Sequence, residues 1–272
     1  MKNNIIHKKV FIILIFVSIL LVVDFIIFSI NQHNSFFIKT VKKYYFANTL
    51  EDSRNYFVNY EKSFQTDERI MFNWLWPESA IGTKNAFEED PFMRLLDISD
   101  TKYAKNSGSI EKKYTNVMTD PTDDVLLEAL FCDIQKYDYS DFEKLKEARD
   151  FVGGYGDTHY LIGLLFLNSL ECMDDDILLG QMKAVIIDIQ IAQRGDTLFS
   201  DLFAERVVVL YWAGEKENIK YNWIEKIAAH QRVNGGWIEN GMQESDPHIT
   251  GLSALAIKYF IEDGFEDVWF AK

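Results

Sequence analysis

Apolar residues recur every three to four positions along the second half of the chain, from Pro121 onward. This spacing places the apolar side chains on one face of a helix. The segment from Asp176 to Gln193 also alternates in part, as a strand would, but it is too long for a typical strand, so it is predicted to be helical. About seven helices with short connections are expected, over 121–134, 139–151, 157–167, 176–193, 197–212, 220–231 and 246–259. The pattern thus predicts an all-α array of helical hairpins.

A second pattern, a continuous apolar segment, runs from Val10 to Ile30 and is interrupted only by Ser18, Asp24 and Ser29. Its length matches the roughly 20 residues that cross a bilayer as a helix. Three lysines precede it, so the positive-inside rule places residues 1–9 in the cytoplasm. The sequence predicts a single-pass anchor in the cell membrane, in contact with the lipid bilayer, and an extracytoplasmic C-terminal domain.

A cleaved signal peptide is the alternative interpretation of this segment. It would require the apolar core to end at Val23, before Asp24, and a cleavage site of the A-x-A type. No alanine occurs before Ala47, and an acid near the outer end of the span can reach the headgroups. An uncleaved transmembrane anchor over 10–30 is therefore the favoured interpretation.

The region over 31–119 is less regular than the rest. Residues 31–60 are polar and aromatic and are predicted to form a helix that leaves the membrane, and a short helix is expected near 90–98. The stretch over 100–120 is polar and has few apolar residues, which is typical of a loop or a boundary. The expected organisation is a membrane-proximal region over 31–119 followed by a helical domain over 120–272.

Composition narrows the function classes. The 42 acidic and 28 basic residues give a net charge of −14, which repels nucleic acid, so no nucleic-acid partner is expected. Hydrophobic residues make up 48% of the chain, which excludes a wholly disordered protein.

The cysteines, Cys132 and Cys172, lie within apolar helical patterns, and two buried thiols are expected rather than a disulfide, although the predicted compartment permits one. Their spacing matches no zinc motif.

One local feature occurs twice. A Gly-Gly-aromatic turn is followed by an Asp-x-His step and an apolar helix, first as Gly153-Gly154-Tyr155 with Asp157 and His159, then as Gly235-Gly236-Trp237 with Asp246 and His248. Glycine suits the turn that ends one helix, and Asp suits the N-cap of the next. Pro247 suits the first helical position, where its missing N–H costs nothing.

The second copy resembles a repeat of the prenyltransferase and squalene–hopene cyclase superfamily. Gln231, Gly235 and Trp237 reproduce its QxxxGxW core, within a match over about 223–258, and a weaker copy near 142–167 has Arg149 in place of Gln. The resemblance implies a terpenoid-cyclase-like α/α toroid, in which inner and outer helices surround a central cavity. It gives these three residues a structural role. Residues 120–272 supply three to four hairpins, so the toroid is incomplete unless 31–119 closes it.

The resemblance also bears on cofactors. The protein prenyltransferases bind zinc through Asp, Cys and His, and by similarity His248 corresponds to their histidine. The chain has no Asp-x-Cys pair to supply the other ligands, so zinc is disfavoured and no cofactor is expected. The acidic stretches over 120–124 and 174–176 do not match the DxDD motif of the cyclases, and helix capping explains them.

The repeated Asp-x-His steps supply the candidate chemistry. Asp157, His159, Asp246 and His248 are the candidate catalytic residues, and an acid–base pair would form if both histidines face one cavity. Tyr155 and Trp237 are the candidate ligand-binding walls. The alternative is structural: each Asp caps its helix and each His braces the preceding turn.

Two function classes follow from these residues. The first is a domain that binds a carbohydrate or lipid ligand in a toroid cavity. The second is an enzyme of the polysaccharide-cleaving or prenyl/terpenoid type. The chain has no Gly-x-Ser-x-Gly, P-loop or HExxH motif, so the sequence gives no support to a serine hydrolase, an NTPase or a zincin.

Overall fold

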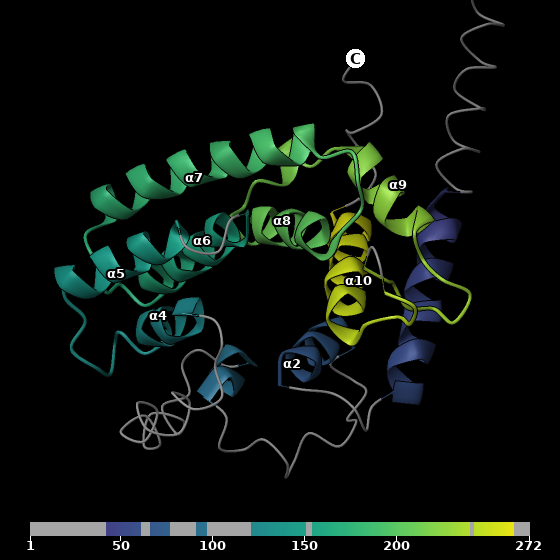
Figure 1. Ribbon diagram of the computed structural model, residues 1–272, viewed down its shortest axis with the longest axis horizontal. Helices are drawn as coiled ribbons and strands as arrows, with labels where there is room; N and C mark the ends of the chain where they lie inside the picture. Colours follow the sequence, from purple (N-terminus) through teal and green to yellow (C-terminus); the bar gives the residue numbers. More distant parts are fainter. Residues whose placement is uncertain are drawn as a thin grey trace, which may run out of the picture. The chain divides into compact units, whose positions relative to one another are not determined.

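The computed structural model describes residues 42–60, 66–76, 91–96, 121–150, 154–239 and 242–263. Every regular element in these residues is a helix (Figure 1), so the all-α prediction is confirmed there. Besides a helix over 42–60, the elements are α2 (Thr66–Leu75), η2 (Pro91–Leu96), α4 (Pro121–Leu130), α5 (Tyr139–Arg149), α6 (Gly154–Ser169), α7 (Asp175–Gly195), α8 (Asp201–Trp212), η4 (Lys216–Asn218), α9 (Tyr221–Ala229) and α10 (Pro247–Glu262).

The chain divides into two compact units, over 1–47 and 48–272. The predicted transmembrane segment over 10–30 lies outside the described residues. Within the described residues, none of the helices combines the length and the apolar character that crossing a bilayer requires. The rest of this description concerns the second unit.

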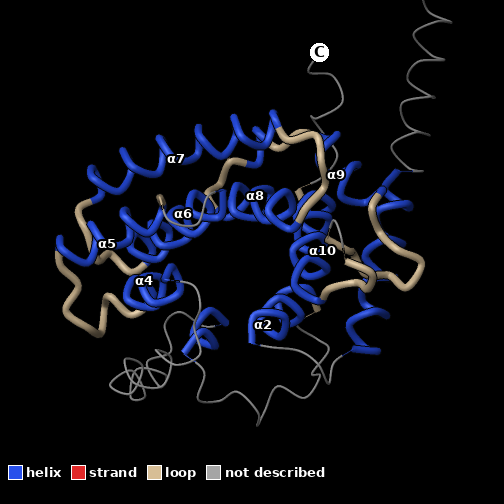
Figure 2. The backbone as a smooth tube through the Cα atoms, viewed as in Figure 1, coloured by secondary structure: helices blue, strands red, loops and turns tan. Residues whose placement is uncertain are grey.

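The helices of the second unit contact one another in a closed order. α4 packs against α6, α6 against α8, α8 against α10 and α10 against α2, and η2 then connects α2 back to α4. Outside this ring, α5 packs against α4 and α6, α7 against α6 and α8, and α9 against α10 (Figure 2). Inner and outer helices therefore alternate along the chain from α4 to α10. The ring closes through α2 and η2, which come from the region before residue 120.

Polar residues define several helix starts. Asp246 accepts hydrogen bonds from the main-chain N–H groups of His248 and Ile249, and Pro247 occupies the first turn of α10, as predicted. Ser200 caps α8 by accepting from the N–H of Phe203. The ambiguous segment near 176–193 is the helix α7, which confirms helix over strand. Each cap satisfies an N–H group that has no partner within its own helix.

The helix α8 is buried along most of its length. Its residues from Phe203 to Leu210 are all buried, because α8 contacts α6, α7 and α10. A helix enclosed on several sides must be apolar nearly all round. Any charged side chain on α8 is therefore buried at a free-energy cost unless it has a partner.

The prediction of two free thiols is wrong. Cys132 and Cys172 form a disulfide, with their Cα atoms 6.0 Å apart. The helices α4 and α6 end at Leu130 and Ser169, so both cysteines lie in the turns that follow. Because α4 packs against α6, these two turns meet. Helical periodicity is local and could not reveal that contact.

A buried arginine attaches η2 to the end of α4. Arg94 is fully buried and donates to the main-chain oxygen of Leu130 and to both carboxylate oxygens of Asp133. Its guanidinium also lies over the ring of Phe131, 4.9 Å from the centroid. The arginine therefore stabilises the contact that closes the ring of helices.

Candidate functional site

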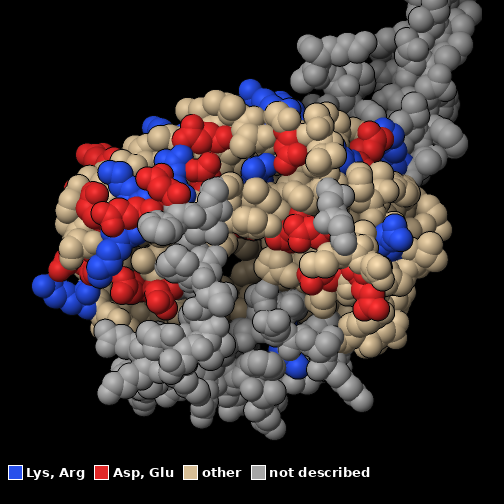
Figure 3. Space-filling model, in the orientation of Figure 1, with Lys and Arg blue, Asp and Glu red and all other residues tan. Residues whose placement is uncertain are grey.

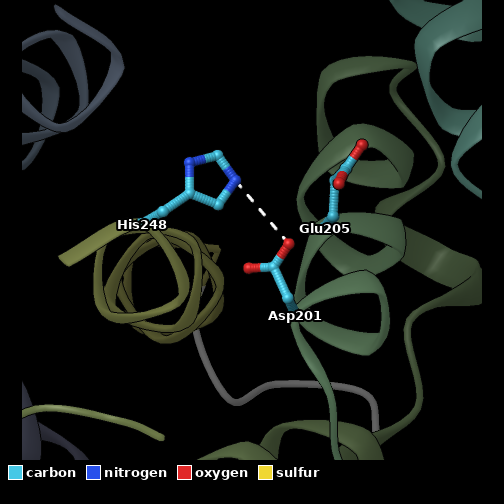
Figure 4. Close-up of side chains that lie close together, drawn as sticks. All are labelled: Asp201, Glu205 and His248. Atoms are coloured by element: carbon cyan, nitrogen blue, oxygen red, sulfur yellow. Dashed lines mark ion pairs between the residues drawn. The ribbon is translucent and has the colours of Figure 1, made fainter. Parts of the chain in front are cut away.

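Three potential metal ligands converge between α8 and α10 (Figure 4). One ligand atom each from Asp201, Glu205 and His248 lies within 4.8 Å of the other two. His248 Nε2 is 3.7 Å from Asp201 Oδ2, close enough for an ion pair but too far for a hydrogen bond. The two acids are four residues apart on α8, so they occupy the same face of that helix.

The helix α6 adds two more polar side chains to this cluster. The hydroxyl of Tyr155 donates to Asp201 Oδ2 at 3.2 Å. His159 Nε2 lies 3.6 Å from Glu205 Oε1. Tyr155 and His159 are also four residues apart, and their ring centroids are 6.2 Å from each other. The acid pair on α8 thus lies beside one histidine from α6 and another from α10.

The residues of the cluster lie at the beginnings of α6, α8 and α10. Gly154 permits the close approach of α6 to α8, because a Cβ atom there would lie 2.5 Å from Leu202 Cδ2. A Cβ atom on Gly156 would lie 1.8 Å from the main-chain oxygen of Arg149. Gly154 therefore allows the tight packing of α6 on α8 that brings Tyr155 and His159 to the acids, and Gly156 allows the close contact with the end of α5.

Burial dominates the electrostatics of Asp201. Desolvation raises the pKa of Asp201 from 3.8 to about 6; the neighbouring His248 opposes this rise and Glu205 adds to it. Desolvation also raises the pKa of the Tyr155 hydroxyl, and Asp201 adds to that effect. Asp201 Oδ1 and Glu205 Oε1 are both buried without a hydrogen-bond partner. Such oxygens are rare in folded proteins, and a bound ion is one recognised explanation.

Three of the sequence candidates, His159, His248 and Tyr155, lie in the cluster, but the histidines are beside other acids than those the sequence paired with them. Asp157 accepts a hydrogen bond from Arg149 Nε at 2.5 Å, away from the cluster. Asp246 serves as the N-cap of α10. The carboxylates next to the two histidines are those of Asp201 and Glu205 instead.

The other candidate residues make structural contacts. Trp237 is fully buried and donates from Nε1 to the main-chain oxygen of Ile227, so it does not form an open ligand-binding wall in this structure. Gln231 donates from Nε2 to the main-chain oxygens of Thr49 and Gly235. Gly235 has a φ of +85°, which favours glycine. These contacts connect the turn before α10 to the helix over 42–60.

Asp201 and Glu205 were not among the candidates drawn from the sequence. The signal that could have found them is chemical: both acids lie in the helix Asp201–Trp212, in which Arg206 is the one other charged residue. They are only 8% and 5% exposed. Ionisable residues in a helix that must be buried are a reasonable starting point in a search for a site.

The donor set fits a divalent transition metal. Three atoms no more than 4.8 Å apart share a point within about 2.8 Å of each, whereas zinc bonds to oxygen and nitrogen are about 2.0–2.2 Å. Shifts of less than about 1 Å would therefore bring two carboxylates and one imidazole to bonding distance of one ion. His159 and Tyr155 are placed to contact these ligands or a bound molecule.

Comparison of the chain with protein-family models, curated proteins and solved structures gives no match. The function is therefore argued from the geometry and chemistry of the site.

Proposed function

We propose that this chain is a metal-dependent enzyme in which Asp201, Glu205 and His248 bind a divalent ion of the zinc class. The observation that carries the proposal is the pair of buried carboxylates on α8, each with an oxygen that lacks a hydrogen-bond partner. Two negative charges on one buried helix face repel each other, and burial penalises both. A divalent cation beside the His248 imidazole would offset both costs.

Three protein ligands that leave a position open are typical of catalytic rather than structural zinc sites. In such a site the ion supplies Lewis-acid activation of an oxygen. The Tyr155 hydroxyl is held on a carboxylate oxygen of Asp201, and His159 lies beside Glu205. These two side chains can position a bound molecule and exchange protons with it.

The architecture we propose for this centre is an α/α toroid. Its support is the closed order of contacts among α2, η2, α4, α6, α8 and α10, with α5, α7 and α9 outside them. The space-filling view also has a hollow near the middle of the face drawn (Figure 3). We propose that a carbohydrate or lipid binds in the toroid. We also propose that residues 10–30 anchor the chain in the membrane, with the helical domain on the extracytoplasmic side.

Metal analysis tests the proposal. The full chain, purified in detergent and stripped with a chelator, is dialysed against zinc and its metal content measured. We expect about one zinc per chain, and at least a tenfold loss of affinity in Asp201→Asn, Glu205→Gln and His248→Ala. Glu147→Gln and His230→Ala are the matched controls, since both residues are exposed and lie outside the cluster. Zinc binding that is absent, or equal in all variants, would contradict the proposal.

A metal-free acid–base centre is the second candidate. It is favoured by the pKa of Asp201, which burial brings to about 6 and which therefore lies close to the pH at which a general acid is effective. An enzyme that cleaves a polysaccharide could use this carboxyl with His248. The chelator separates the two candidates: activity that survives removal of metal and disappears in Asp201→Asn supports the second.

A further inference from the structure

The outer helix α7 has an apolar face that is exposed. Its opposite face packs against α6 and α8 through Leu178, Met182, Val185, Ile186 and Ile189. The exposed face carries a row at alternating spacings of three and four residues, formed by Ile177, Gly180, Ala184, Ile187 and Ile191. Ile187 is 55% exposed and Ile191 is 61% exposed. We call these five residues the α7 stripe.

The stripe distinguishes α7 from the other outer helices. The exposed positions of α5 include Ser140, Lys144, Lys146 and Glu147, and those of α9 include Asn222 and Glu225. A helix with one buried face normally presents charged and polar residues on the opposite side. The stripe lies directly opposite the buried residues of α7, where such polar residues would be expected. Apolar side chains gathered there indicate an interaction surface.

We propose that the α7 stripe binds the stripe of a second copy of this chain, with the two α7 helices parallel and in register. The spacing of the stripe is that of the apolar positions of a coiled coil, sustained over about two heptads from Ile177 to Ile191. Gly180 and Ala184 are small, and a Cβ atom on Gly180 would meet nothing within 4 Å. The two helices can therefore approach closely at this part of the stripe. This inference does not depend on the proposed metal site.

Charges beside the stripe determine the choice of partner and direction. Lys183 flanks the stripe on one side and Asp188 on the other, five residues later. In a parallel pair, flanking positions five residues apart on the two helices face each other, so each Lys183 meets the Asp188 of the other copy. In an antiparallel pair, the side of the stripe that carries Lys183 faces the same side of the other copy, so Lys183 no longer meets Asp188. The side chain of Asp188 is 49% exposed and is held by Arg149.

Single cysteine variants test the arrangement. The native cysteines are both in the disulfide, so one introduced cysteine is the sole free thiol. Ile177→Cys, Ala184→Cys and Ile191→Cys are oxidised mildly in the full chain in detergent, with Ser140→Cys on α5 as the control. A parallel, in-register pair places each of these residues next to its own copy, so all three should form covalent dimers at least tenfold faster than the control. An antiparallel pair would instead leave residues 177 and 191 uncrosslinked, which would overturn the proposal.

The second measurement is the molar mass of the protein within its detergent complex, which shows whether the chain is a dimer. We expect a dimer for the unmodified chain at tens of micromolar, and at least a tenfold weaker dimer for Ile187→Glu, which places two acids in one apolar layer. Ser140→Glu should leave the dimer unchanged. Lys183→Glu should weaken it, because each Lys183–Asp188 contact then joins two acids. A monomeric unmodified chain, or an Ile187→Glu variant that dimerises as well as Ser140→Glu, refutes the inference.

Discussion

Replacing Asp201 by Asn is expected to stabilise the metal-free chain. Burial raises the pKa of Asp201 from 3.8 to about 6, so the folded chain disfavours the ionised carboxylate. Between these two pH values the folded chain binds more protons than the unfolded chain, so the free energy of unfolding falls as the pH rises. At about 1.36 kcal/mol per pH unit, ionisation costs about 3 kcal/mol above pH 6. Asn removes this cost and keeps an oxygen that can accept the Tyr155 hydroxyl.

Urea unfolding followed by tryptophan fluorescence measures the effect, in the presence of excess chelator and over pH 4.5–8. The stabilisation in Asp201→Asn should be up to about 3 kcal/mol at pH 7.5 and should shrink towards zero as the pH falls to about 4. Glu147→Gln, a change at an exposed acid on α5, is the control. With zinc present at 100 times its dissociation constant, the free energy of unfolding of the unmodified chain should rise by about 2.7 kcal/mol, while that of Asp201→Asn should rise little.

Two results would refute this reasoning. If Asp201→Asn is no more stable than the unmodified chain at pH 7.5, the ionised carboxylate is not penalised by burial. If the difference between the two proteins does not change with pH, the stabilisation comes from something other than the titration of Asp201.

Three further predictions concern the frame around the site. Reducing the disulfide removes a cross-link between residues 40 positions apart in the sequence. It should lower the free energy of unfolding by about 4 kcal/mol, measured by urea titration with and without reductant. Gly235→Ala should destabilise the chain by more than about 1–2 kcal/mol, because φ is +85° and the new Cβ atom would lie 2.0 Å from a main-chain oxygen. Gly214→Ala, at φ +77° with open space around it, should lower the melting temperature less. Asp133→Ala should lower the free energy of unfolding by about 3 kcal/mol in urea titrations, because it leaves the buried guanidinium of Arg94 without its carboxylate. A decrease below about 1 kcal/mol would contradict this role of Asp133.

Helices were predictable from the sequence because their period is local. The predicted helix near 176–193 extends over Asp175–Gly195, and the Asp246 cap and Pro247 are where the sequence placed them. The disulfide was not predictable in this way, since it depends on α4 packing against α6. The closure of the ring by α2 and η2 is likewise a long-range contact.

The pairing of His159 with Asp157 could have been questioned from helix geometry alone. Residues two apart on a helix project about 200° from each other, so Asp157 and His159 cannot share one face. The structure places Asp157 against Arg149 and His159 against Glu205 accordingly. Choosing the correct partner required knowledge of which helices are neighbours.

The site lies where α8 carries two buried acidic side chains close together. Asp201 and Glu205 are like charges at a spacing of four, on a helix whose other residues are almost all apolar and buried. Both the repulsion and the desolvation oppose folding in the absence of a cation. The same two terms favour a divalent ion that binds between them. Neutralising Asp201 should therefore raise the stability of the metal-free chain and lower its affinity for metal together, whereas an acid with only a structural role would lose stability when neutralised.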